Sequence, residues 1–491
     1  MSQPDTDEPD PRRWRALAVT LTAGFMSLLD VSIVNVALPS IQTGLGASVA
    51  GTQWVVSGYA LTFGLVLVTG GRLGDALGRR RMFLIALSAF IATSAVAGAS
   101  VDETMLVGAR LLQGAAAGML TPQNTGLIQE LFRGAERGRA FGLFGATVGI
   151  STAVGPVLGG LIISGFGADN GWRWVFYVNV PIGLLALVLA SRLLPRAPAR
   201  RGTLRSQLDF PGMVLLGLTV LGLLLPLVQS EQGGLSALWW LFPLALVFGF
   251  VFVRWELRVL RKDCVPLLDP RLYTRTPGYA LGAAIGATYF CGFAGMWLVF
   301  AMFFQRGLGY SPLESGLLVT PFALGSAVSA AIAGRAVARW GRRVTVTGLC
   351  LVACGLGLVA LLVPLVPESA IGYAVAGPLL LAGVGGGMVI SPNTTLTLDS
   401  VPTRMAGVAG GALQTGQRLG TALGVAVLGS VFHAGVSASD EDYRVALAAA
   451  MLCSVCFTLA ALALAVVDAR QHPHRRLTEQ AQSVTRTGPN R

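Results

Sequence analysis

Two charged residues stand inside long apolar stretches of this 491-residue chain. Asp30 lies within the apolar run from Ala16 to Leu38, and Arg110 lies within the run 105–128. Because a charge at the centre of a bilayer costs about 2.5–3.5 kcal/mol on insertion scales, each of them needs a compensating partner. A carboxylate beside a guanidinium compensates both charges, and a small change in its surroundings can make it take up or release a proton. The two residues could therefore form a proton-handling site.

The helices that carry Asp30 and Arg110 must place them at one depth. With a rise of about 1.5 Å per residue, Asp30 lies about 22 Å along its helix from Arg15. Arg110 lies about 10 Å from Glu103, and its run crosses in the opposite direction. Both charges then fall in the outer half of the membrane, and we predict that they form a proton-coupling pair. A static pair that only fixes helix packing is the alternative.

The composition supports this membrane interpretation. The chain is 53% hydrophobic and 12% charged, with a mean hydropathy of +0.66, whereas soluble proteins carry about 25% charged residues. The apolar residues form blocks long enough to cross a bilayer, so we predict an all-α polytopic membrane protein. The fourteen predicted spans are 16–38, 50–70, 82–100, 105–128, 140–163, 174–192, 208–228, 236–254, 277–304, 312–333, 344–366, 371–392, 406–432 and 446–467.

The basic residues orient these spans. If the N-terminal tail 1–15 is cytoplasmic, all but five of the 36 basic residues fall on the inner side, as the positive-inside rule requires. The five exceptions are Arg173, Arg306 and Arg444 outside, and Arg110 and Arg418 within spans. The tail 468–491 is then cytoplasmic too. We predict that the protein lies in the plasma membrane of a bacterium. The net charge of +12 faces the inner leaflet, so it does not indicate nucleic-acid binding.

The chain contains an internal repeat. The segments GRLGDALGRR (71–80) and GRAVARWGRR (334–343) share one pattern, and both fall on the inner side. Four glycines of the predicted fifth span recur at the same spacing in the thirteenth, Gly142 matching Gly407. We therefore predict a six-helix bundle at 16–192, two inserted spans within 193–275, and a second six-helix bundle at 276–467. Parallel repeats of this kind are a transporter plan with the substrate site between the halves.

Several segments resemble the major facilitator superfamily, in particular its fourteen-span drug:proton antiporter branch. They are LDVSIVNVALP (29–39), GRLGDALGRRR (71–81), RLLQGAAAG (110–118) and GLFGATVGISTAVGPVLGG (142–160). The resemblance implies the major facilitator fold and a secondary exporter that exchanges protons for small amphipathic compounds such as drugs, dyes or antibiotics. The alternatives are an uptake symporter or facilitator on the same fold, and a membrane sensor that transports nothing.

Two of these segments imply roles for particular residues. The loop motif implies a conformational latch made by Gly71, Asp75, Gly78, Arg79 and Arg80. Asp75 could cap a helix or pair with arginines across the repeat interface, and the second copy has Ala338 in its place. The antiporter motif comprises Gly142, Gly155, Pro156, Gly159 and Gly160, for which generic small-residue packing is the alternative.

The candidate substrate-binding residues are Gln113, Gln414, Gln417 and Arg418. The last three share one face of a helix by their i, i+3, i+4 spacing, so they could line a cavity or form interhelical hydrogen bonds. Asn35 points away from Asp30 around its helix, and we expect it to pack or to bond to a neighbouring helix. We predict no enzyme activity, no metal, no cofactor and a monomer in the bilayer. The chain has no phosphate-binding G-x-x-x-x-G-K-[ST] motif, which disfavours an ATP-driven pump.

Overall fold

The chain folds into helices throughout the part that its computed structural model describes, which is residues 11–167, 169–195, 209–230, 233–262, 264–439 and 442–472. Most of both predicted tails lies outside these residues. Eleven helical segments of the described part are long and apolar enough to cross a membrane. Three further helices are also long: α4 (Glu103–Leu131), α5 (Gly134–Phe166) and α11 (Leu241–Arg261), with 29, 33 and 21 residues.

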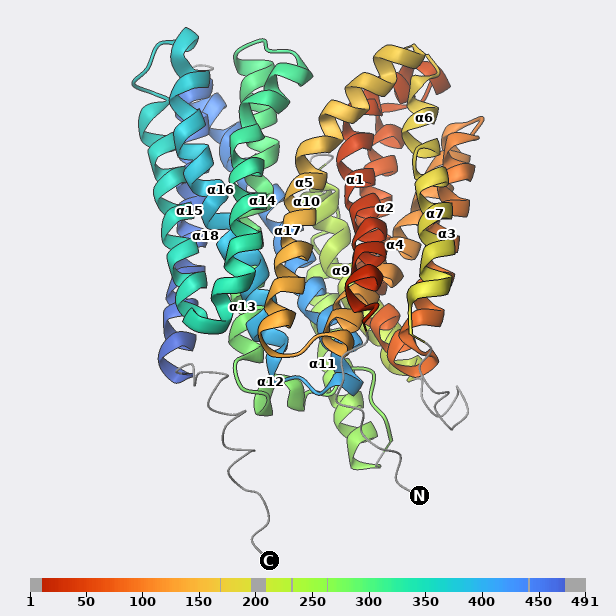
Figure 1. The fold of residues 1–491 in the computed structure, drawn as a ribbon. Helices are drawn as coiled ribbons and strands as arrows, with labels where there is room; N and C mark the ends of the chain where they lie inside the picture. Colours follow the sequence, from red (N-terminus) through yellow and green to blue (C-terminus); the bar gives the residue numbers. More distant parts are fainter. Residues whose placement is uncertain are drawn as a thin grey trace, which may run out of the picture.

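Two bundles account for most of the molecule (Figure 1). The first contains α1 (Arg13–Leu45), α2 (Val49–Leu77), α3 (Arg79–Gly98), α4 (Glu103–Leu131), α5 (Gly134–Phe166), α6 (Gly171–Tyr177) and α7 (Asn179–Leu193). The second contains α13 (Tyr279–Met302), α14 (Pro312–Trp340), α15 (Arg342–Leu362), α16 (Glu368–Asp399), α17 (Ala406–Ala438) and α18 (Tyr443–Gln471). The predicted sixth span is thus divided into α6 and α7, and the predicted ninth span ends in a π-helical turn, Phe303–Gly307.

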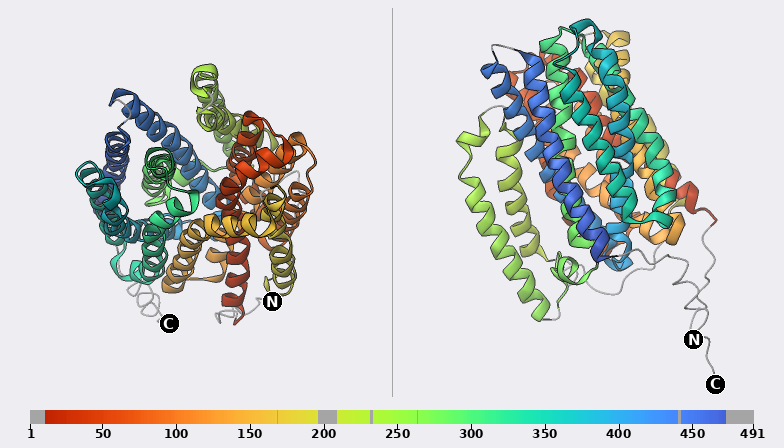
Figure 2. Two further views of the ribbon diagram at one scale, coloured as in Figure 1. Left: turned by 90° about the horizontal axis from the view of Figure 1, so that it is seen from above. Right: turned by 90° about the vertical axis from the view of Figure 1, so that its left-hand side faces the viewer.

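Two long helices that lie between the bundles in the sequence pack on the outside of the molecule (Figure 2, right). This inserted segment contains α9 (Phe210–Val228), α10 (Gly234–Ala237), α11 (Leu241–Arg261) and α12 (Arg271–Arg275). α9 packs on α2 of the first bundle and α17 of the second, because Leu61, Leu224 and Ala422 belong to one buried apolar cluster. We call the end of the molecule where α1 begins and α18 ends the inner end; it lies at the bottom of Figure 1.

α5 contacts a different partner at each of its ends. Near the inner end, Gly142 lies against Gly334 of α14, in the other bundle. Toward the outer end, Gly155 lies against Ser32 of α1, in its own bundle. A Cβ at Gly155 would overlap the Ser32 side chain, and a Cβ at Gly142 would lie only 3.0 Å from α14, so glycine lets α5 approach both helices closely.

α17 repeats this arrangement from the other side. Near the inner end, Gly407 lies against Gly71 of α2, in the first bundle, and farther out Gly420 lies against Ala287 of α13. These are glycines that the predicted repeat aligns with Gly142 and with Gly155. The two bundles therefore meet along the inner half of α5 and α17 and diverge toward the outer end.

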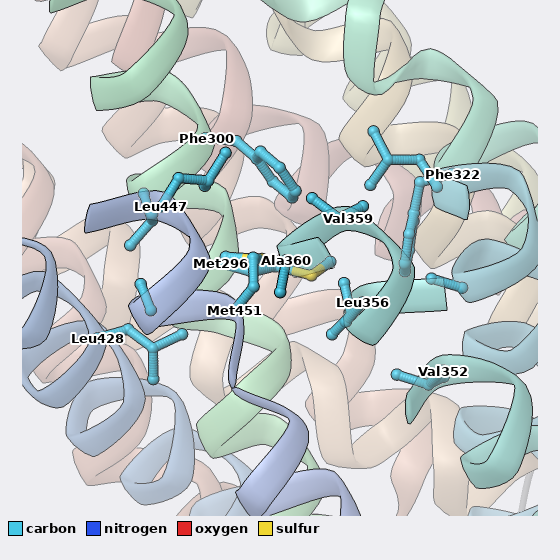
Figure 3. Close-up of a cluster of buried hydrophobic side chains, with 14 of the residues drawn as sticks. Met296, Phe300, Phe322, Val352, Leu356, Val359, Ala360, Leu428, Leu447 and Met451 are labelled. Carbon is cyan, nitrogen blue, oxygen red and sulfur yellow. The ribbon is translucent and has the colours of Figure 1, made fainter. Parts of the chain in front are cut away.

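A large cluster of buried apolar side chains lies inside the second bundle (Figure 3). Met296 and Phe300 of α13 pack with Leu356 of α15 and with Leu447 and Met451 of α18, all at most 1% exposed. Because lipid is as apolar as these side chains, their close van der Waals packing, and not their removal from water, holds the helices together. The cluster joins α13, α15 and α18, and Leu428 and Phe432 of α17 also belong to it.

Candidate functional site

Asp30 of α1 and Arg110 of α4 lie in direct contact inside the first bundle. The guanidinium Nη1 of Arg110 donates to Oδ2 of Asp30 at 2.5 Å, and the two residues are 1% and 0% exposed. The contact between Asp30 and Arg110, which we predicted because both residues fall at one depth in the membrane, is thus present in the structure. Their role in proton coupling stays a prediction.

Two amide side chains complete the surroundings of the carboxylate. Gln113 and Asn179 each donate to Oδ1 of Asp30 at 2.9 Å. Gln113 also donates to the Ser94 hydroxyl at 2.7 Å and accepts from Arg110 at 2.8 Å. Gln113 is completely buried and bonded to the charged pair, so the structure places it in the charge site; its contact with a substrate stays a prediction.

The sequence interpretation missed Asn179 and Ser94. Asn179 begins α7, and the signal that could have found it is a lone amide within an apolar predicted span, two residues before Pro181. Ser94 on α3 gave no signal, because a serine in a membrane helix usually bonds to its own backbone. We name the set Asp30, Arg110, Gln113, Asn179 and Ser94 the charge network.

Arg110 makes further contacts that fix its position. Its Nε donates to the carbonyl oxygen of Val55 at 2.9 Å. Its guanidinium carbon lies 4.2 Å from the centroid of the Tyr59 ring and 5.7 Å from that of Phe176. Tyr59 in turn donates its hydroxyl to the Ser27 carbonyl at 3.1 Å. The charge network therefore joins α1, α3, α4 and α7, and Tyr59 attaches it to α2.

Protonation of Asp30 would remove a charge on which this network depends. With Asp30 ionised, its two oxygens accept three hydrogen bonds from Arg110, Gln113 and Asn179. Protonation would leave the buried guanidinium without its counter-charge, which costs about 3–5 kcal/mol. A proton on Asp30 therefore favours an arrangement in which Arg110 finds water or another acceptor.

Arg418 of α17 lies at the boundary between the two bundles. Its guanidinium carbon is 4.2 Å from the centroid of the Phe63 ring of α2. Phe63 stacks on Tyr59, with ring centroids 6.0 Å apart, so aromatic rings connect Arg418 to Arg110. Arg418 is half-buried.

The two glutamines of the predicted polar face also lie on α17. Gln414 and Gln417 are half-buried. The Gln417 amide lies beside Gly286 of α13, where a Cβ would come within 3.3 Å of its Nε2. The structure thus brings Gln414, Gln417 and Arg418 to one region of α17 but not into the charge network. Asn35, which we expected to pack or bond to a helix, is instead exposed.

The loop motif joins the two bundles at the inner end. Asp75 of α2 accepts hydrogen bonds from the backbone N–H groups of Gly407 at 3.2 Å and Val408 at 3.0 Å. It thereby caps the start of α17 in the other bundle. Arg79 pairs with Asp75 at 3.1 Å within its own bundle and donates to the Thr403 carbonyl across the interface at 2.5 Å.

The other residues of the motif shape this turn. Gly71 allows the close approach to α17, because a Cβ there would overlap the carbonyl oxygen of Gly407. Gly78 has a φ of +94°, a backbone conformation that favours glycine. Arg80 donates to the Ser191 carbonyl of α7 at 2.5 Å.

The antiporter motif places α5 against α1 within one helical turn of Asp30. Gly155 contacts Ser32, and Gly159 contacts Ile33. The Ser32 hydroxyl also bonds to the Ser151 carbonyl of α5 at 3.1 Å. The helix that changes partner between the bundles therefore packs directly on the helix that carries Asp30.

Two residues of the antiporter motif, Pro156 and Gly160, have no described contact with α1. A Cβ at Gly160 would meet nothing within 4 Å, so that glycine is not required for close packing in this conformation. The side chain of Pro156 lies outside the part of the chain that the structure describes.

The sequence matches the profile of the Major Facilitator Superfamily over residues 20–425, with a second match over 283–488. The chain belongs to the major facilitator superfamily. The human organic anion transporter MFSD10 (TETRAN) shares its fold, with a TM-score of 0.66, 16% identity and coverage of 93% of this chain and 100% of that one.

The relatives place this member of the superfamily among drug efflux transporters. A probable actinorhodin transporter of Streptomyces coelicolor is 37% identical over 86% of this chain and 73% of its own. A puromycin resistance protein of Streptomyces alboniger is 36% identical over 93% and 89% of the two chains. The chain is therefore a multispan membrane transporter of the drug efflux type.

Proposed function

We propose that this transporter is a proton-coupled antiporter that exports small amphipathic compounds, such as antibiotics, by alternating access. It would lie in the bacterial cytoplasmic membrane with both termini in the cytoplasm. In this proposal α4, α5 and α11 also cross the bilayer, which gives fourteen spans. The names of the relatives support antibiotics as the class of compound.

The observation that carries the proposal is the buried carboxylate of Asp30 with its three donors. Asp30 lies completely buried in an apolar helix, where an ionisable group is a functional-site hypothesis by default. A purely structural link between α1 and α4 could be made by apolar packing at lower cost. A carboxylate held by Arg110, Gln113 and Asn179 instead offers two states that differ by one proton.

The packing suggests how a proton could be coupled to movement. α1 carries Asp30 and contacts α5 through Ser32. α5 reaches the second bundle through Gly142. A change in the charge network that shifts α1 would therefore act on the interface where the bundles meet. The present conformation, joined at the inner end, corresponds to a carrier open toward the outside.

The test is the variant Asp30→Asn in everted membrane vesicles. The substitution keeps the shape of the side chain and removes its titration. We expect the vesicles to lose drug-dependent proton release, with a normal amount of folded protein in the membrane. Matched vesicles carrying Asp102→Asn, at an exposed helix cap, should release protons like the wild type. Undiminished release by Asp30→Asn would remove Asp30 from the mechanism.

A further inference from the structure

Arg418 stands on the face of α17 that lies against α2 of the other bundle. Nearer the inner end Gly407 contacts Gly71 of α2, and Arg418 itself lies over Phe63 of α2. Beyond Arg418, α17 packs on α13 through Gly420 and shares an apolar cluster with α2 and α9 through Ala422. Arg418 therefore lies at the interface of the two repeats, where transporters of this plan bind their substrates.

No carboxylate neutralises Arg418 among the residues that the structure describes. The Phe63 ring lies beside it instead, and Tyr59, which stacks on Phe63, is neutral and donates its hydroxyl to the Ser27 carbonyl. Its nearest charged analogue, Arg110, is paired with Asp30. Arg418 is thus a half-buried guanidinium without a counter-charge in the described part of the chain, and an anion would compensate the part of its charge that is removed from water.

The surroundings of Arg418 suit an acidic aromatic compound. The planar guanidinium can bind a carboxylate through two parallel hydrogen bonds. The Phe63 ring lies against one face of the guanidinium, which leaves the N–H edge for a ligand. Gln417 is the residue before Arg418 and Gln414 lies one helical turn away, and their amides could add neutral hydrogen bonds. Asp30, by contrast, is completely buried and accepts hydrogen bonds from Arg110 and Gln113. Its carboxylate is therefore not free to bind a cationic compound.

We propose that Arg418 binds an anionic group, such as a carboxylate or phenolate, of the transported compound, and so makes this exporter selective for acidic amphipathic molecules. This inference rests on the proposed export function and adds the charge of the substrate. The competing explanation is a clamp, in which the contact of Arg418 with Phe63 only holds α17 against α2.

The experiment compares an aromatic dye carrying one carboxylate with its uncharged methyl ester, in everted vesicles. Vesicles that contain the wild-type protein should accumulate both compounds. Arg418→Gln should lower kcat/KM for the acid by about 10-fold or more, the usual effect of losing a charge-assisted hydrogen bond, and leave the ester within about twofold. Arg418→Lys should keep part of the acid transport. Arg306→Gln, at an exposed outer position, controls for a change in overall charge.

A second variant and a second measurement separate binding from clamping. Phe63→Leu removes the aromatic contact but keeps the guanidinium, so the ratio of acid to ester transport should be preserved. The acid should raise the melting temperature of the purified wild type, and this shift should disappear in Arg418→Gln.

Three other outcomes would contradict the anion site. Equal loss of acid and ester transport in both Arg418→Gln and Phe63→Leu would establish the clamp and overturn the anion site. Wild-type transport of the ester without the acid would also overturn it, while export itself would stand. Transport of neither compound, with no thermal shift by the acid, would contradict both proposals.

Discussion

Arg342 and Asp468 form a buried ion pair between α15 and α18, with Nε and Oδ2 2.5 Å apart. Arg342 occupies the position in the second loop motif that Arg79 occupies in the first. The first motif carries its own carboxylate, Asp75, whereas the second has Ala338 at that position. The last helix supplies the missing carboxylate, and it does so within the second bundle rather than across the interface.

We expect Asp468→Asn to destabilise the second bundle. Arg342 and Asp468 are 7% and 2% exposed, and removing one partner of a buried pair costs about 3–5 kcal/mol. The melting temperature of the purified protein in detergent should fall by several degrees. Glu368→Gln breaks an ion pair with Arg444 in which the carboxylate is 68% exposed, so it should leave the melting temperature unchanged. Equal melting of the two variants would argue against the pair as a structural element.

Asn179→Leu should impair proton coupling while the protein still folds. The change removes one of the three donors to Asp30, and a hydrogen bond to a charged group contributes about 1.5–3 kcal/mol. Drug-dependent proton release, normalised to folded protein, should fall by about tenfold or more. Asn170→Leu makes the same replacement at an exposed turn and should behave like the wild type. Normal coupling in Asn179→Leu would mean that Arg110 and Gln113 suffice.

Asp75→Asn should open the inner end of the molecule. It removes the charge that caps α17 through Gly407 and Val408, which weakens the conformation in which the bundles meet there. Spin labels at the exposed positions 81 and 343, one in each bundle, should report a longer mean distance by double electron–electron resonance. Asp102→Asn, at the exposed cap of α4, should leave that distance unchanged, and so would Asp75→Asn if the latch were unimportant.

Cysteine labelling tests whether α11 crosses the membrane. A cysteine at Ser236, before α11, should react with an impermeant maleimide in intact cells. A cysteine at Arg261, at the end of α11, should react only after the membrane is opened. Both positions are exposed, so access to the protein surface is matched. Reaction of both cysteines from outside would contradict fourteen spans.

The sequence by itself determined the helical membrane fold and the depth of its buried charges. Blocks of apolar residues of bilayer length allow one solution, because a helix satisfies its own backbone hydrogen bonds without water. The constant rise per residue then places Asp30 and Arg110 at one level, and the repeat aligns Gly142 with Gly407. These features depend on positions along one helix, which spacing in the sequence reports directly.

Only the tertiary structure decided which side chains meet across helices. Asn179, Ser94 and Asp468 come from distant segments, and the rotation of each helix about its axis, which the packing of its neighbours sets, brings them to their partners. The same packing placed Gln113 in the charge network and left Arg418 outside it, with Phe63 rather than a carboxylate beside it. A side chain's depth follows from counting residues, but its partner follows from the shapes of all the helices around it.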